Sequence, residues 1–214
     1  MPSRTATTIS GEISGEALGV VDYHEHLYFD APSWLLREDR DFKLDNVDSS
    51  AEELRSWSAA GGNTIVEMTA IDFGRNIREV LRVAQQVPEV NVIAITGYNK
   101  PYFCHRAILL QDEQEMVDGC IRDIQVGIDG TGVKAGIMKG GSGYNTFQEP
   151  DQKLLRIAAK VQVQTGVPVI THTEAGTMGF EQVTFLAEHS VRPDRVCLSH
   201  MDRNPDFWEH RRIA

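Results

Sequence analysis

Residues 165–173 read TGVPVITHT, and this stretch contains the features that decide the fold. Gly166 stands where a helix over Pro150 to Thr165 should end, because glycine readily adopts the left-handed conformation found at helix C-termini. Residues 167–171 form a short apolar run, which is typical of a strand buried on both faces. His172 follows at the end of this run. The stretch therefore predicts a helix, then a buried strand, then a polar residue at the strand end.

The same alternation recurs along the chain. Five further apolar runs have the character of buried strands, and they are residues 19–23, 63–68, 91–96, 133–138 and 195–199. Helical patterns lie between the runs, one beginning at Ser50 and the others over residues 75–86, 113–126, 150–165 and 177–188. Because strands alternate with helices at a spacing typical of βα units, the chain is predicted to be an α/β protein with a parallel sheet.

The composition excludes several classes of protein. The 214 residues include 21 basic and 31 acidic side chains, for a formal net charge of −10, whereas a nucleic-acid-binding protein normally has a basic excess. The hydrophobic fraction of 41% is too high for a disordered chain. The sequence contains no apolar run of about 18 residues, and its first residues lack the apolar core of a signal peptide. We therefore expect a cytoplasmic protein that binds neither nucleic acid nor membrane.

The cysteine pattern agrees with a reducing compartment. Cys104, Cys120 and Cys197 are widely spaced and odd in number, which is not the pattern of a disulfide framework. Cys197 lies in the middle of an expected strand, so we expect it to be a small core residue.

Two architectures combine a parallel sheet with alternating helices. A doubly wound sheet usually has a glycine-rich phosphate loop after its first strand, whereas residues 22–26 read DYHEH. A (β/α)8 TIM barrel places its chemistry at the C-terminal ends of several strands. We therefore predict a single barrel domain over residues 1–214. Only about six βα units are present, so strands seven and eight of the usual eight would be missing from this chain.

Histidine and lysine side chains stand at four of the expected strand ends. They are His24 and His26, Lys139, His172 and His200. Residues two apart in a strand project from the same face, so the first two imidazoles can chelate one metal ion. Each residue taken singly is also compatible with ordinary structure, namely a hydrogen-bonded histidine or a lysine whose amine reaches solvent. Because all five stand at strand ends, we predict a metal site.

Four segments are similar to a known family. They are residues 22–26, 136–139, 165–173 and 195–200, which read DYHEH, GIMK, TGVPVITHT and RVCLSH. With this pattern the chain resembles the phosphotriesterase family of the amidohydrolase superfamily over essentially its whole length. The resemblance implies a metal-dependent hydrolase barrel with two divalent metal ions. These are usually zinc, although manganese, cobalt and iron suit the same ligands.

The resemblance also implies a role for each residue of the metal centre. His24 and His26 would bind the buried metal, and His172 and His200 the more exposed one. Lys139 would bridge both ions as an N-carboxylated lysine, formed by addition of CO2 to the neutral amine. A hydroxide that bridges the two metals would attack the substrate.

One expected residue of this centre is missing. The family carries a general-base Asp at the end of strand eight, and that Asp is absent from the chain. Asp202 follows the last histidine closely but stands in the strand-six loop. Asp22 precedes the histidine pair and is expected to support a ligand histidine. A truncated, non-catalytic metal-binding homologue is therefore one interpretation, since a barrel without its last strands has open edges.

Three segments resemble the lactonases of the family that open phosphorylated sugar lactones, and they are residues 96–100, 173–178 and 200–206. The chain would then open such a lactone, and a phosphotriesterase or another ester or amide hydrolase is the alternative. Lys100 and Arg203 would hold the phosphate, and Tyr98 and Tyr144 would shape the pocket. Solvated rim charges and ordinary packing are alternative interpretations of these four residues. Family members are often dimers, so a homodimer is one expectation.

Overall fold

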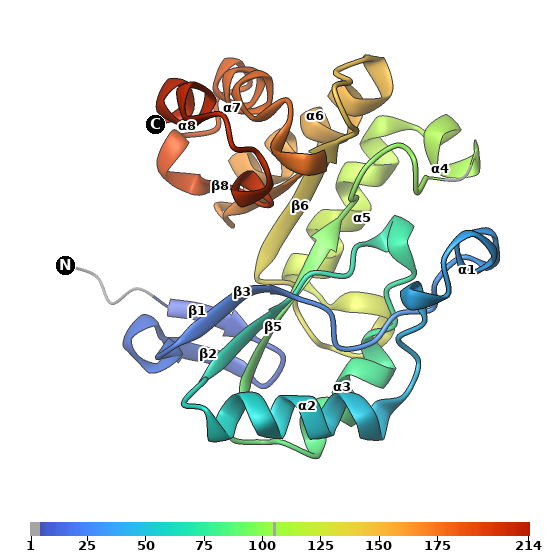
Figure 1. The fold of residues 1–214 in the computed structure, drawn as a ribbon, viewed down its shortest axis with the longest axis vertical. Helices are drawn as coiled ribbons and strands as arrows, with labels where there is room; N and C mark the ends of the chain where they lie inside the picture. The colour runs from blue at the N-terminus through green and yellow to red at the C-terminus, as the bar shows by residue number, and fades with distance from the viewer. Residues whose placement is uncertain (1–4, 105) are drawn as a thin grey trace. The chain divides into compact units, whose positions relative to one another are not determined.

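Six strands form one sheet with the order β3-β4-β5-β6-β7-β8 in the computed structural model, which describes residues 5–104 and 106–214 (Figure 1). Their bounds are β3 Val21–Glu25, β4 Thr64–Glu67, β5 Asn91–Gly97, β6 Ile137–Ser142, β7 Val169–Thr173 and β8 Val196–Leu198. The β3–β4, β4–β5, β6–β7 and β7–β8 pairings are parallel. An antiparallel hairpin, β1 (Thr5–Thr8) and β2 (Gly11–Ser14), precedes the sheet and was not expected from the sequence pattern.

Helices separate the strands along the chain. Their bounds are α1 Ser33–Glu38, α2 Val47–Ala59, α3 Ile77–Gln85, α4 Arg106–Leu110, α5 Glu113–Gln125, α6 Glu149–Thr165, α7 Gly179–Glu188 and α8 Phe207–Ile213. The five predicted helical patterns correspond to α2, α3, α5, α6 and α7. Because sheet order follows chain order with a helix in each connection, the prediction of an α/β chain built from six βα units of a TIM barrel is confirmed.

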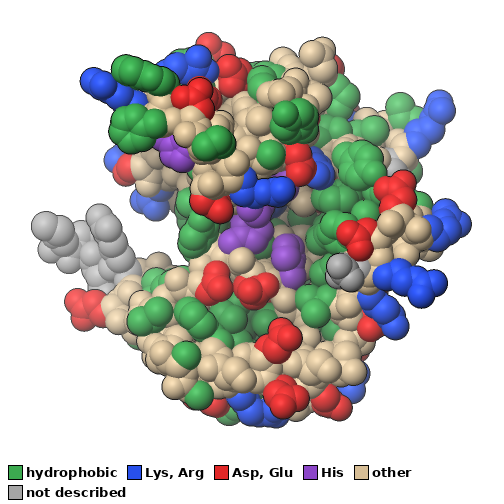
Figure 2. All heavy atoms as spheres, viewed as in Figure 1, with side chains coloured by type: hydrophobic (Ala, Val, Ile, Leu, Met, Phe, Trp, Pro, Cys, Tyr) green, Lys and Arg blue, Asp and Glu red, His purple; other side chains and the backbone are tan. Residues whose placement is uncertain are grey.

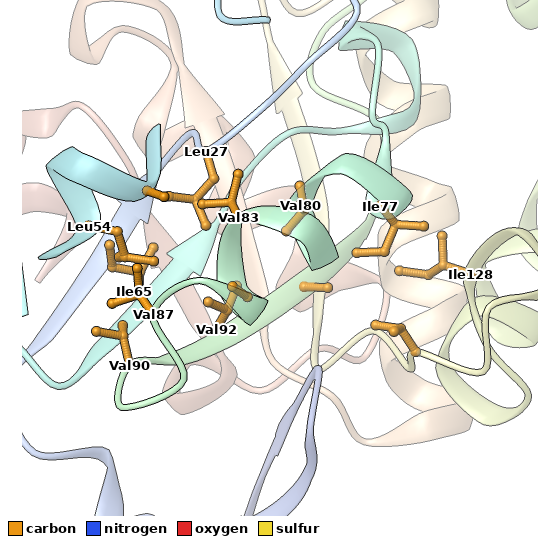
Figure 3. Packing of buried hydrophobic residues seen from close by; sticks show 14 of the residues in the cluster. Leu27, Leu54, Ile65, Ile77, Val80, Val83, Val87, Val90, Val92 and Ile128 are labelled. Carbon is orange, nitrogen blue, oxygen red and sulfur yellow. The ribbon is translucent and has the colours of Figure 1, made fainter. Parts of the chain in front are cut away.

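The described residues group into two compact units. The first unit comprises the described residues up to Ile95 together with Arg122–Gly136. Its core is an apolar cluster of buried side chains from the strands, α2 and α3 (Figure 3). Ile77, Val80 and Val83 line the buried face of α3 because they recur at helical spacing.

The start of α3 and the position of the hairpin are each set by a hydrogen bond in this unit. The side chain of Asn76 caps α3 by accepting from the backbone N–H of Glu79 at 3.2 Å. The backbone N–H of Ile9, in the turn between β1 and β2, donates to the carbonyl of Val92 at 2.8 Å. The hairpin is thereby attached to β5.

The second unit comprises Thr96–Ile121 and Ile137–Ala214 and contains β6, β7 and β8. In β6, two glycines permit close packing on both faces. A Cβ at Gly140 would lie 3.2 Å from the Cβ of Ala158 on α6. A Cβ at Gly141 would lie 2.4 Å from the backbone oxygen of Asn99 and 2.7 Å from the Cβ of His172. Glycine at both positions therefore lets β6 approach its neighbours.

Two expectations from the sequence differ from the structure. The apolar run at 133–138 was expected to be a strand closed by the two glycines, but β6 begins at Ile137 and continues through them to Ser142. Cys197 was expected in the core but is exposed, because β8 is short and last in the strand order. The expectation of one domain over residues 1–214 stays a prediction.

Two properties of the described surface and helices concern binding partners. No helix in the described part of the chain has the length and apolar character needed to cross a membrane. On the face shown in Figure 2, Lys and Arg side chains are interspersed with Asp and Glu.

Candidate functional site

The two histidines of the first unit stand at the end of β3. The ring centroids of His24 and His26 lie 5.7 Å apart in an edge-to-face arrangement. The register of β3 with β4 shifts between Asp22 and Glu25, and such irregularities often redirect side chains at functional sites. Asp22, expected to support a ligand histidine, accepts a hydrogen bond from the backbone N–H of His24 at 3.0 Å. This contact holds the backbone of β3 at the histidine pair.

Two buried residues orient the ring of His26. Glu67 is the last residue of β4, and Thr69 follows that strand. Nδ1 of His26 lies 2.9 Å from Oγ1 of Thr69, and this hydroxyl donates to Oε1 of Glu67 at 2.5 Å. With Glu67 ionised, the hydroxyl proton is directed at the carboxylate, so the hydroxyl oxygen accepts from Nδ1–H. The imidazole is thus held in the tautomer that carries its lone pair on Nε2, which is the form needed for a metal ligand.

Glu67 is fully buried and titrates abnormally. Burial raises the pKa of Glu67 to about 7, although hydrogen bonds from Thr69 and from the backbone of Leu27 act in the opposite direction. This residue was not expected from the sequence to belong to the site. Its signal was a carboxylate inside an otherwise apolar run, where an ionised group needs compensating partners.

The second unit brings together three of the predicted metal-centre residues. Lys139 lies on β6 with only 1% of its surface exposed, His172 lies on β7, and His200 directly follows β8. The ring centroids of the two histidines are 4.9 Å apart. Burial lowers the pKa of His172 to about 4 and also lowers the pKa of His200, and the charge of Lys139 adds to both shifts. Both imidazoles are therefore neutral at pH 7, which is the metal-binding form.

Glu174 joins this group and was not assigned a role from the sequence. It begins a short 3-10 helix, Glu174–Gly176, immediately after β7. Its Oε2 lies 3.0 Å from Nε2 of His172 and also accepts from Nζ of Lys100. The hydrogen bond with His172 and the hydrogen bond and charge of Lys100 together lower the pKa of Glu174 to about 2, against the effect of burial. The signal in the sequence was a carboxylate two residues after a predicted ligand.

A cavity of about 470 Å³ lies beside these residues within the second unit. Lys100, Tyr144 and Glu174 line it, together with Tyr102 and a loop that follows β6. Nζ of Lys100 also lies 4.7 Å from the ring centroid of Phe103. The structure thus places two of the four predicted substrate residues at one cavity.

The other two predicted substrate residues do not line this cavity. Tyr98 is buried just after β5, where its backbone N–H donates to the carbonyl of Lys139 at 3.3 Å. Arg203 is exposed in the 3-10 helix Met201–Arg203. Their assignment to substrate binding stays a prediction.

The described residues do not form a complete metal-binding group of His, Cys, Asp or Glu side chains. In residues 5–104 and 106–214, no set of three or more His, Cys, Asp or Glu side chains is arranged to hold a metal ion. The predicted set in the second unit contains two histidines and a lysine, and an amine becomes an oxygen ligand only after carboxylation. The ligand assignments therefore stay predictions.

Residues 4–213 match the phosphotriesterase family. The chain is 32% identical to a phospho-furanose lactonase of Mycoplasmopsis synoviae, an alignment that covers 100% of this chain and 64% of that protein. It superposes on the crystal structure of an amidohydrolase from Mycoplasma synoviae with a TM-score of 0.93 and 32% identity, covering 100% of this chain and 64% of that one. A lactonase from Listeria monocytogenes gives a TM-score of 0.91 at 28% identity, with 98% and 69% covered. The chain thus spans about two thirds of the length of these relatives.

Proposed function

The chain belongs to the phosphotriesterase family, and we propose that it functions as a metal-dependent hydrolase that opens a lactone, with a phosphorylated sugar lactone as the substrate. The similarity to phospho-furanose and other lactonases supports this choice. The chain spans 64% of the first of these relatives, so the activity of the whole protein is part of the proposal.

The observation that carries the proposal is the group formed by Lys139, His172 and His200. Lys139 is 1% exposed, and carboxylation of its amine by CO2 would turn the side chain into an oxygen ligand beside the two histidines. The low pKa values of the two histidines keep both rings ready to bind a cation at neutral pH. These properties fit a divalent metal with nitrogen and oxygen ligands.

Each unit would contribute its own ligands. In the first unit, His24 and His26 would bind one metal, and Thr69 keeps the lone pair of His26 on Nε2. In the second unit, His172, His200 and carboxylated Lys139 would bind the other. Bound divalent metal ions would supply Lewis acidity toward the substrate carbonyl and a water of lowered pKa.

The cavity in the second unit supports an anionic substrate. Lys100 lies at its wall as a point charge, and a phosphate bound there would gain a charge-assisted hydrogen bond. Tyr144 is exposed at the same cavity, where it would contact the sugar portion. The volume of about 470 Å³ is in the range of small-molecule pockets, which run from about 300 to 1,000 Å³.

The test is a turnover screen of the 214-residue protein, loaded with zinc or manganese, against phosphorylated and unphosphorylated sugar γ-lactones and against paraoxon. We expect hydrolysis of phosphorylated lactones and its loss in Lys139→Ala. Turnover of paraoxon without lactone turnover would contradict the proposal and indicate a phosphotriesterase. Metal binding at about two ions per chain without any turnover would instead support the non-catalytic interpretation.

A further inference from the structure

A single carboxylate oxygen serves two partners in the second unit. Oε2 of Glu174 lies 3.0 Å from Nε2 of His172 and accepts from Nζ of Lys100 as well. The side chains of Lys100 and Glu174 are 12% and 26% exposed, so this ion pair is partly shielded from solvent. The two partners differ in position, since His172 is buried and Lys100 reaches the cavity.

The charges of this group fix the direction of each hydrogen bond. An ionised carboxylate only accepts, so Nε2 of His172 must carry the proton and Nδ1 carries the lone pair. Lys100 partly neutralises the same oxygen. The strength of the bond from Nε2–H to Oε2 therefore depends on how much of the negative charge of the carboxylate Lys100 neutralises.

We propose that Glu174 is a positioning residue that couples the binding of an anion at Lys100 to the imidazole of His172. An anion in the cavity competes with Oε2 for the ammonium of Lys100. The less neutralised carboxylate then holds Nε2–H more strongly, which makes Nδ1 a better electron-pair donor. By linkage, a cation bound at Nδ1 would strengthen anion binding by the same factor.

This coupling rests on the proposed function only in its choice of an anionic ligand. Its test uses metal-free protein and inorganic phosphate as the probe, so it is independent of catalysis. The measurement is the side-chain 15N chemical shift of His172, assigned by comparison with His172→Gln. We expect a spectrum of the Nε2–H tautomer, and a saturable change in both ring nitrogen shifts as phosphate is added.

Three variants separate the coupling from simple folding effects. Lys100→Met should abolish the response of His172 to phosphate. Glu174→Gln should also abolish it, yet should bind phosphate about two- to fivefold more tightly, because Lys100 no longer shares its charge with a carboxylate. Glu181→Gln is the matched control. Glu181 lies on α7 and forms an ion pair with Arg212 of α8 at 3.2 Å, so this variant should leave the response of His172 unchanged.

Two results would overturn the coupling. One is a wild-type His172 signal that stays constant at saturating phosphate. The other is a Glu174→Gln protein whose His172 responds as in the wild type, with circular dichroism showing that the variant is folded. Failure of lactone hydrolysis would leave these measurements unaffected, so the two proposals fail separately.

Discussion

The hydroxyl of Thr69 lies 2.9 Å from Nδ1 of His26, although the two residues are 43 positions apart in the chain. Thr69 is completely buried and also donates to Glu67. This arrangement resembles the way in which metal-binding histidines are commonly oriented, with a hydroxyl group interposed between the ring and the carboxylate. The orientation of one predicted ligand is therefore built into the first unit.

Replacing Thr69 tests this orientation. Thr69→Val removes the hydroxyl while retaining most of the side-chain volume, so Nδ1 of His26 loses its acceptor. We expect zinc affinity to fall by about 10- to 100-fold, the usual effect of losing such a partner. Competition with a chromophoric chelator measures the affinity. Thr69→Ser keeps the hydroxyl and is the control, so an equal loss of affinity in both variants would contradict the role of the hydrogen bond.

The buried carboxylate of Glu67 predicts a specific pH dependence of stability. Its pKa is raised from 4.5 to about 7 in the folded protein, so the folded state favours the protonated form. The contribution is fully present below pH 4.5 and is lost as the pH rises through 7. The loss amounts to about 3 kcal/mol in the free energy of unfolding.

Urea unfolding of wild type and Glu67→Gln between pH 4.5 and 8 isolates this contribution. The wild-type curve alone is insufficient, because His172, with its pKa lowered to about 4, destabilises the fold as the pH falls below 6.5. The difference between the two proteins cancels that effect. A difference that does not change with pH would show that Glu67 does not titrate in this range.

The close approach at Gly141 predicts a large cost for any side chain there. An alanine Cβ would lie 2.4 Å from the backbone oxygen of Asn99, and a backbone atom cannot rotate away. We expect Gly141→Ala to lower the free energy of unfolding by about 2–4 kcal/mol. Thermal or urea denaturation measures the change.

Gly119 provides the matched control for that substitution. It lies within α5, and a Cβ there would meet nothing within 4 Å. Gly119→Ala should stabilise the protein by about 0.5–1 kcal/mol, because alanine loses less backbone entropy in a helix. Similar effects of the two substitutions would contradict the packing seen at β6.

Substituting a buried and an exposed leucine compares the contribution of the core of the first unit to stability with that of a surface residue. Leu54 on α2 is 1% exposed, whereas Leu110 on α4 is 70% exposed. Leu54→Ala removes buried apolar volume and should cost about 2–5 kcal/mol in the free energy of unfolding. Leu110→Ala should change it by less than about 0.5 kcal/mol. Equal effects in urea denaturation would show that the cluster around Leu54 is not a packed core.

The strand-end residues were predictable from local pattern, but their partners were not. His172 follows an apolar run that glycine separates from a helix, and these signals need only neighbouring residues. Lys100 and Glu174 are 74 positions apart, so their ion pair depends on how distant segments pack. The start and end of β6 were misjudged for the same reason, since the pairing of Gly140, Gly141 and Ser142 with β7 carries the strand past the apolar run.

The sequence by itself determined the alternation of strands and helices, the family resemblance and the placement of His24, His26, His172 and His200 at or next to strand ends, whereas Lys139 lies inside β6 because that strand continues to Ser142. Periodicity, helix-ending glycines and apolar run length are properties of short segments, so they can be read without a structure. Only the tertiary structure decided that Thr69 and Glu67 orient His26 and that Glu174 joins His172 to Lys100. These contacts arise because burial brings together polar groups from separate segments, and each buried group then requires a partner.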